Sequence, residues 1–98
     1  MIIGKIVGNV VCTQKDPSLV GRKMLVVQPV NIETLEDSGS LFVALDGVGA
    51  GENELVMVVG GSSARMADGM AKVPVDRSIV GILDSIEVGG KTIFTKSG

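Results

Sequence analysis

Two glycine-rich segments flank one short apolar run in the middle of the chain. The sequence Asp-Gly-Val-Gly-Ala-Gly occupies positions 46–51, the run Leu55–Val59 follows, and Gly-Gly-Ser-Ser-Ala-Arg comes next at 60–65. Alternating glycines suit a loop that needs positive φ or a close approach to a neighbouring backbone. These segments leave no side chain suited to catalysis. In so small a chain another copy of itself is the favoured neighbour, so the pattern indicates assembly rather than chemistry.

The length predicts one domain spanning residues 1–98, and the composition is unusually apolar for a soluble monomer. Hydrophobic residues make up 45% of the chain, and its mean hydropathy is +0.45. No apolar run approaches the roughly 20 residues of a membrane-spanning helix. The opening Met-Ile-Ile-Gly-Lys-Ile-Val-Gly has no basic leader and predicts a first strand rather than a signal peptide. We therefore expect the apolar excess in a core and in subunit interfaces.

Charge and residue usage exclude several classes of function. The net charge is −2, there is no histidine, and Phe42 and Phe94 are the only aromatic residues. The chain therefore offers neither a basic field nor a stacking platform, so we expect no nucleic-acid or anionic-membrane partner. The single cysteine, Cys12, cannot form an internal disulfide and fits a reducing cytoplasm. We expect it to be a small buried hydrophobe, which excludes Cys/His catalysis and Cys/His metal sites.

Valine, isoleucine and glycine dominate the sequence, and stretches with helical periodicity are nearly absent, so the chain is expected to be mainly β. A polar segment at Asn31–Ser40 predicts an exposed connection, and Ser62 could cap a short helix over Ser63–Ala67. The expected strands are Ile2–Thr13, Met24–Val30, Leu41–Leu45, Leu55–Val59 and Ile79–Val88, the last continuing through a Gly89-Gly90 hairpin turn to Lys91–Thr95. This order of short strands predicts a small closed barrel. Gly4 and Gly8 within the first strand indicate strong bending or close packing.

Two groups of residues admit a chemical interpretation beside a structural one. Asp46, Glu52 and Glu54 could offer oxygens to a hard cation, but their spacing matches no known calcium loop, and solvated loop charges are favoured. The 47–51 glycines do not form a dinucleotide loop, because a strand follows them rather than a helix. The segment 60–65 could bind an anion at a helix start. The favoured alternative is a capped helix in which Arg65 pairs with a carboxylate, for which Asp76 is a plausible partner.

Taken together, several blocks of sequence resemble a known family. The blocks are 8–15 (Gly-Asn-Val-Val-Cys-Thr-Gln-Lys), 19–28, 46–51 with Glu54, 61–65 (Gly-Ser-Ser-Ala-Arg), and 74–76 (Pro-Val-Asp) with 79–84. In this order they resemble the EutN/CcmL family, the vertex proteins of bacterial microcompartment shells. Two departures are mild: Asn53 stands where glycine is often found before the glutamate, and Met24 stands where leucine is common.

The resemblance implies a five-stranded, OB-like barrel that forms a pentamer at the fivefold corners of a cytoplasmic protein shell. Hexameric shell proteins of the same microcompartment would be its partners, and neither a cofactor nor catalysis is implied. The 31–40 segment cannot identify the shell. Ser-Ser-Ala-Arg at 62–65 and the short ending Gly-Gly-Lys-Thr-Ile-Phe slightly favour shells that house catabolic enzymes over carboxysomes. Residues expected at a subunit interface or in pore loops are Asp46, Gly47, Val48, Gly49, Ala50, Gly51, Ser62, Ser63, Ala64, Arg65 and Asp76.

The sequence is compatible with two other classes of function. An OB-type ligand-binding module would share the fold without assembling into a shell. A small enzyme using Asp46 or Glu54 is remote, because a single acid–base residue would lack a partner or a metal.

Overall fold

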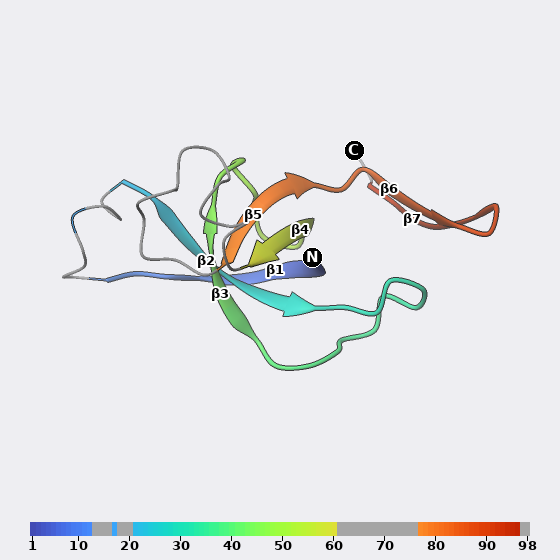
Figure 1. Cartoon of the computed structure of the whole chain (residues 1–98), viewed down its shortest axis with the longest axis horizontal. Helices are drawn as coiled ribbons and strands as arrows, with labels where there is room; N and C mark the ends of the chain where they lie inside the picture. The colour runs from blue at the N-terminus through green and yellow to red at the C-terminus, as the bar shows by residue number, and fades with distance from the viewer. Residues whose placement is uncertain (13–16, 18–20, 61–76, 97–98) are drawn as a thin grey trace.

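A computed structural model describes residues 1–12, 17, 21–60 and 77–96 of the chain. Its strands are β1 (Ile2–Val10), β2 (Lys23–Pro29), β3 (Phe42–Asp46), β4 (Leu55–Gly60), β5 (Arg77–Ile82), β6 (Ser85–Val88) and β7 (Lys91–Thr95). The first five close into a barrel in the order β1-β2-β3-β5-β4, while β6 and β7 pair only with each other (Figure 1). All pairs in the barrel are antiparallel except β3 with β5. The expected five-stranded, OB-like barrel is confirmed.

Alternating apolar residues on each strand fill the interior of the barrel. In β2, Leu25 and Val27 are buried, while Val26 between them is only partly covered. Strand alternation sends successive side chains to opposite faces, so every second residue reaches the core. The buried cluster comprises Ile6, Leu25, Val27, Ala44, Ala50, Val56, Val58 and Ile79, with Ile2, Phe42 and Ile82 packed against it. The core is thus drawn from all five barrel strands and from the loop before β4.

The first strand contains one glycine that the core requires. Gly4 is buried, and a Cβ atom built on it would overlap the Val27 side chain and approach the Gln28 backbone. Close packing at this position, which the sequence predicted, is therefore confirmed. Further along, the register of β1 against β2 shifts between Ile6 and Gly8, which marks a β-bulge.

The end of the first strand differs from expectation. β1 ends at Val10 rather than at position 13, and Cys12 is exposed rather than buried. The β1–β2 ladder closes with the pair Val10 and Met24. Val11, directly after it, is 89% exposed. The prediction of a buried Cys12 was wrong. The apolar pattern of the sequence continues to Cys12, but the strand that forms the barrel wall ends two residues earlier, at Val10.

The expected strand Ile79–Val88 is two strands with a break between them. β5 ends at Ile82, and the backbone N–H of Leu83 donates to the Leu55 carbonyl at 2.9 Å. The carbonyl of Asp84 then accepts the backbone N–H of Lys96 at 2.7 Å. These two bonds close the last barrel pairing and the base of the hairpin, so the chain turns away from the barrel at this point.

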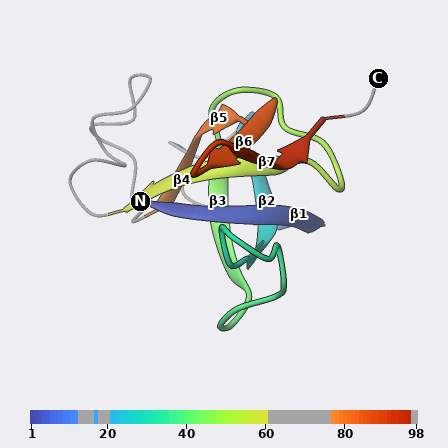
Figure 2. The same cartoon turned by 90° about the vertical axis from the view of Figure 1, so that its right-hand side faces the viewer.

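The β6–β7 hairpin and the connection between β2 and β3 extend from the same end of the barrel. They lie on opposite sides of β1 in the two views (Figures 1 and 2). Gly89 and Gly90 have φ of +57° and +80°, the signature of a type I′ turn, so the predicted hairpin is confirmed. The connection Asn31–Ser40 is largely exposed, as expected. The expected helix at 63–67 lies outside the described residues.

Candidate functional site

The first glycine-rich loop begins at Asp46, the last residue of β3, whose side chain sets its shape. Asp46 Oδ1 accepts hydrogen bonds from the backbone N–H groups of Val48 and Gly49, at 3.0 Å each. The backbone N–H of Gly47 donates to the carbonyl of Ile79 in β5, at 3.3 Å. An aspartate that accepts from the backbone two and three residues onward closes a turn with its own side chain. Asp46 therefore organises the loop at the junction of β3 and β5.

Backbone conformation distinguishes the three alternating glycines of this loop. Gly49 has φ of +82°, a region that strongly favours glycine, whereas Gly47 and Gly51 do not have positive φ. Ala50, between them, is fully buried in the core. Further along, Asn53 adopts φ of +69°. The loop thus buries one apolar side chain, Ala50, in the barrel, and two of its residues, Gly49 and Asn53, adopt the left-handed backbone conformation before β4 begins.

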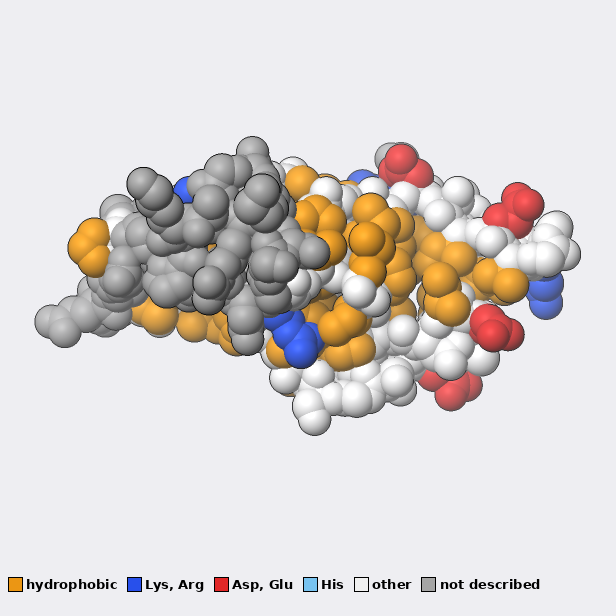
Figure 3. All heavy atoms as spheres, in the orientation of Figure 1, with side chains coloured by type: hydrophobic (Ala, Val, Ile, Leu, Met, Phe, Trp, Pro, Cys, Tyr) orange, Lys and Arg blue, Asp and Glu red, His pale blue; other side chains and the backbone are white. Residues whose placement is uncertain are grey.

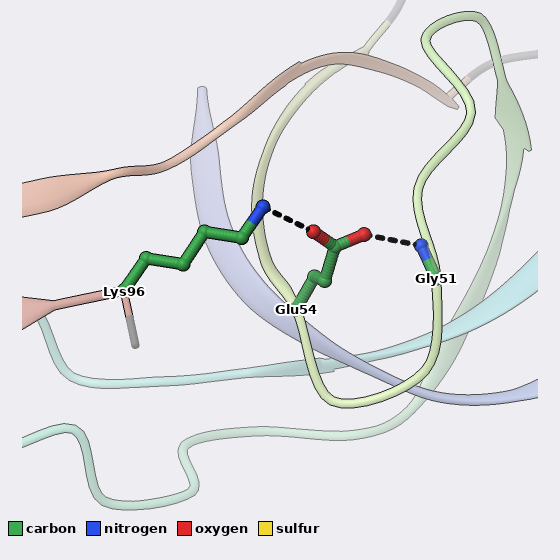
Figure 4. A network of polar contacts seen from close by, with 3 residues as sticks. All are labelled: Gly51, Glu54 and Lys96. Carbon is green, nitrogen blue, oxygen red and sulfur yellow. Dashed lines mark hydrogen bonds and ion pairs between the residues drawn. The ribbon is translucent and has the colours of Figure 1, made fainter. Parts of the chain in front are cut away.

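Glu54 holds the far end of the loop and also reaches the base of the hairpin (Figure 4). Its Oε1 atom accepts the backbone N–H of Gly51, and its Oε2 atom accepts Lys96 Nζ, both at 2.6 Å. A Cβ atom on Gly51 would lie only 3.3 Å from the same Oε1. The carboxylate is therefore enclosed between the loop backbone and an ammonium group, and it joins the loop to the chain after β7.

The electrostatics of this contact favour the charged forms of both partners. The hydrogen bond from Lys96, aided by the backbone N–H of Gly51, holds the pKa of Glu54 below its ordinary value. The hydrogen bond to Glu54 raises the pKa of Lys96 above its ordinary value. Each partner thus remains ionised across neutral pH, as expected for a charge-assisted hydrogen bond. This geometry suits a structural contact rather than acid–base catalysis, because a carboxylate held in its charged form does not readily exchange a proton near pH 7.

The acidic residues of the loop do not gather into a metal site. Within the described residues, no group of three His, Cys, Asp or Glu side chains is placed to hold a metal ion. Asp46 and Glu54 instead accept hydrogen bonds from their own loop, and Glu52 is exposed.

The second glycine-rich segment lies outside the described residues. This applies to the expected interface or pore residues Ser62, Ser63, Ala64, Arg65 and Asp76, and to the Arg65–Asp76 pair. The first loop, at 46–51, is the part of the candidate site that the structure describes.

An open apolar groove of about 730 Å³ runs between the start of β1 and the β2–β3 connection. Its lining includes Ile3, Val30, Ile32 and Leu41, and Arg77 is the one charged side chain among the described residues that line it. The Arg77 guanidinium lies over the Phe42 ring, 4.2 Å from its centroid, in a cation–π contact. On the face shown in Figure 3, hydrophobic side chains cover the middle of the molecule and acidic ones gather at the hairpin end.

Comparison with known proteins gives the site its context. The sequence model described as "Ethanolamine utilisation protein EutN/carboxysome" matches residues 1–84. The carboxysome shell vertex protein CcmL of Gloeobacter violaceus is 42% identical over 96 residues, which are 98% of this chain and 95% of the relative. The chain belongs to the EutN/CcmL family. The matched residues include all five barrel strands and end one residue before β6.

Solved structures of EutN/CcmL proteins have the same fold. The structure of Gloeobacter violaceus CcmL superposes with a TM-score of 0.91 over 98% of each chain. The GrpN pentameric microcompartment shell protein from Rhodospirillum rubrum, 45% identical, gives a TM-score of 0.80 and covers 90% of this chain and 99% of its own. The likeness to a protein that forms a pentamer thus extends over most of the described barrel.

Sequence reasoning missed two residues of this EutN/CcmL site. Lys96 was not expected near Glu54, because 42 positions separate them and no local pattern links them. Asn53 was noted only as a departure from the family glycine. Its positive φ explains that glycine, since asparagine is among the few other residues that tolerate this conformation. Asparagine directly before a carboxylate, at the end of a glycine-rich loop, is the signal that could have identified this turn.

Proposed function

We propose that this chain is a structural protein that forms a homopentamer at the fivefold vertices of a bacterial microcompartment shell. The observation that carries the proposal is the likeness of the barrel to a pentameric shell protein at 45% identity. Relatives named shell vertex proteins from several bacteria support the same role. The whole chain acts as a single vertex domain, located in the shell within the cytoplasm.

The task of such a protein is geometric. Hexagonal tiles alone form flat sheets, and a pentagonal unit introduces the curvature that closes a polyhedron. A heterologous interface that closes after five copies produces this unit. Hexameric shell proteins of the same microcompartment are the partners that the pentamer would contact along its rim. No catalytic step is needed for this role, in keeping with carboxylates that serve the loop itself.

The glycine loop is proposed to lie at a subunit boundary or beside the central pore. Its tip residue Val48 is 43% exposed, while Asp46 and Glu54 fix the backbone on either side. A loop with so little freedom can present its backbone to a neighbouring copy without a large loss of conformational entropy. The second glycine-rich segment is proposed to have the same kind of role.

Native mass in solution is the test of this function. Native mass spectrometry or light scattering on a sizing column should give a species close to five times the 10.1 kDa mass of the chain. Co-expression with the hexameric shell proteins of the same organism should then give closed polyhedra by electron microscopy, and open sheets or tubes when the chain is omitted. A stable monomer would overturn the proposal and favour a ligand-binding module that uses the apolar groove.

A further inference from the structure

β2 carries aliphatic side chains on both of its faces, and those on the outer face are only partly covered. Leu25 and Val27 are buried in the core, while Met24 and Val26 alternate with them and face outward. Strands that are apolar on both faces are typical of sheets covered on both sides. The chain itself covers one end of this outer side, because Leu45, the partner of Met24 on β3, is 2% exposed. The part around Val26 has the composition of a surface that another layer covers.

The strands beside β2 extend this apolar outer surface. Val26 pairs with Gly8 of β1 and with Val43 of β3 in the two ladders. Val7 precedes Gly8 within the bulge, so both oppose Val26. Val43 is 44% exposed and Val7 is 37% exposed. We name these four residues, Val7, Gly8, Val26 and Val43, the outer valine face. None of them carries a charge or a polar side chain.

The outer valine face adjoins the apolar groove. Leu41, two residues before Val43, is 57% exposed and lines that groove. The outer valine face and the groove therefore adjoin each other at the start of β3, while the polar Gln28 follows Val26 on the outer side of β2. Contiguous apolar surfaces of this kind mark contact sites in soluble proteins more often than isolated exposed residues do.

Gly8 lies on the β1 side of this face, beside the central Val26, and nothing in the described chain requires a glycine there. Its φ is not positive, and a Cβ atom on it would meet only Val26 side-chain atoms at ordinary distances of 3.7 and 3.8 Å. Gly4 in the same strand is different, because there a Cβ atom would overlap Val27. The missing side chain at Gly8 therefore leaves the outer surface flat without serving the barrel itself.

We propose that the outer valine face is where a second copy of this chain packs, with its closest approach at Gly8. The inference rests on the proposed pentamer, in which every subunit must bury two different patches against its neighbours. The face lies wholly within residues 1–84, the part matched by the family, and hence within the barrel shared with the pentameric GrpN. An uncharged, flat valine surface covered by a second copy would contribute most of its energy by excluding water.

The test compares Val43→Glu with Val88→Glu. Val88 is 39% exposed and lies on the hairpin, outside the face, so it matches Val43 in exposure and chemistry. Native mass is measured over a dilution series for wild type and both variants. We expect wild type and Val88→Glu to keep the same oligomer. The protein concentration at which Val43→Glu dissociates should be at least about 100-fold higher than that for wild type, because a buried unpaired carboxylate strongly weakens an apolar contact.

The outcomes separate this inference from the proposed function. If wild type is monomeric, the pentamer proposal fails and the interface proposal fails with it. If wild type is pentameric and Val43→Glu has the same dilution profile, the interface proposal alone is overturned. Circular dichroism checks that the variants fold. Should Val43→Glu not fold, Gly8→Ala replaces it: association weakened by about tenfold or more supports the proposal, and wild-type association overturns it.

Discussion

Lys96 Nζ lies 2.6 Å from Glu54 Oε2 and connects the end of the hairpin to the start of β4. The other oxygen of the same carboxylate holds the backbone N–H of Gly51, also at 2.6 Å. One side chain thus fixes the glycine loop and the hairpin base relative to each other. The side chains are partly exposed, at 40% for Lys96 and 24% for Glu54. Solvent screening therefore keeps the contribution of the ion pair to stability small.

Replacing Glu54 with Gln should lower the melting temperature by a few degrees at neutral pH and change its pH dependence. The pKa of Glu54 is lowered in the folded chain, so its stabilising contribution is fully present above the ordinary value of 4.5 and is lost as the pH falls through the lowered pKa. The pKa of Lys96 is raised, so its contribution persists up to 10.5 and is lost at still higher pH.

Melting curves at acidic and neutral pH check this expectation. The difference between wild type and Glu54→Gln should be largest near neutrality and should shrink in acid. Lys96→Met is the matched control, because it removes the same ion pair from the other side while leaving the bond between Glu54 and Gly51. A difference that stays constant from acidic to neutral pH would contradict the assignment.

Replacing Asp46 with Ala should destabilise the folded chain by about 1 kcal/mol, since the N–H groups of Val48 and Gly49 lose their shared acceptor. Asp46→Asn keeps an oxygen in the same place and should cost less than half as much. Denaturant unfolding at one fixed protein concentration measures both variants, because assembly adds a concentration-dependent term to stability. If both variants lost the same amount of unfolding free energy, the negative charge of Asp46 would be what stabilises the loop, rather than its hydrogen bonds to Val48 and Gly49.

Replacing Gly4 with Ala should destabilise the barrel by about 2 kcal/mol, because the new methyl group overlaps Val27 inside a closely packed core. In a Val27→Ala background the same change should cost less, since the colliding methyl group is gone. The relief should be partial, because a Gly4 Cβ would also lie 3.0 Å from the Gln28 carbonyl oxygen. A double-mutant cycle by denaturant unfolding measures this coupling. Strict additivity would rule out the overlap.

The barrel could be predicted from the sequence because its strands carry their own signals. Runs of apolar and β-branched residues located all five barrel strands, to within three residues except at the end of β5. The Gly89-Gly90 pair identified the hairpin, since both residues adopt the positive φ that a type I′ turn requires. These features depend on neighbouring positions only, and single-sequence reasoning can recover such features.

Features that depend on distant partners could not be predicted. Cys12 is exposed because the β1–β2 ladder ends at Val10. The residues next to Val10 contain no sequence signal that predicts this end. The break after Ile82 was missed although Gly81 precedes it and the turn-favouring pair Asp84-Ser85 follows it, because the apolar run continues through Leu83. The place where the chain leaves the barrel depends on its last bond to β4, from Leu83 to Leu55, which lies on another strand. The partner of Glu54 was likewise hidden by the 42 positions that separate it from Lys96.

Asn53 should tolerate glycine but not alanine. Its φ of +69° costs an ordinary L-residue about 1 kcal/mol, whereas glycine adopts it freely. Asn53→Gly is therefore expected to lie within about 0.5 kcal/mol of wild type, and Asn53→Ala to be destabilised by about 1 kcal/mol. Glu52→Ala is a suitable neighbouring control, because Glu52 is exposed and is not among the residues with positive φ. Similar stabilities for Asn53→Ala and Asn53→Gly, measured by denaturant unfolding, would refute the argument from backbone conformation.

A chain that ends at Asp84 should still fold and assemble. Every residue of the buried cluster precedes Ile82, and the family match ends at residue 84. Ile86 is the one buried hydrophobic residue that the truncation removes from the described chain. The β6–β7 hairpin pairs only with itself, and its attachment includes the Lys96 contacts to Glu54 and Asp84. Removal of the hairpin should therefore lower the melting temperature modestly. The native mass should still correspond to the same number of subunits. The Lys96→Met full-length chain separates the loss of the ion pair from the loss of the hairpin. A truncated chain that folds but stays monomeric would instead make the hairpin part of the ring interface.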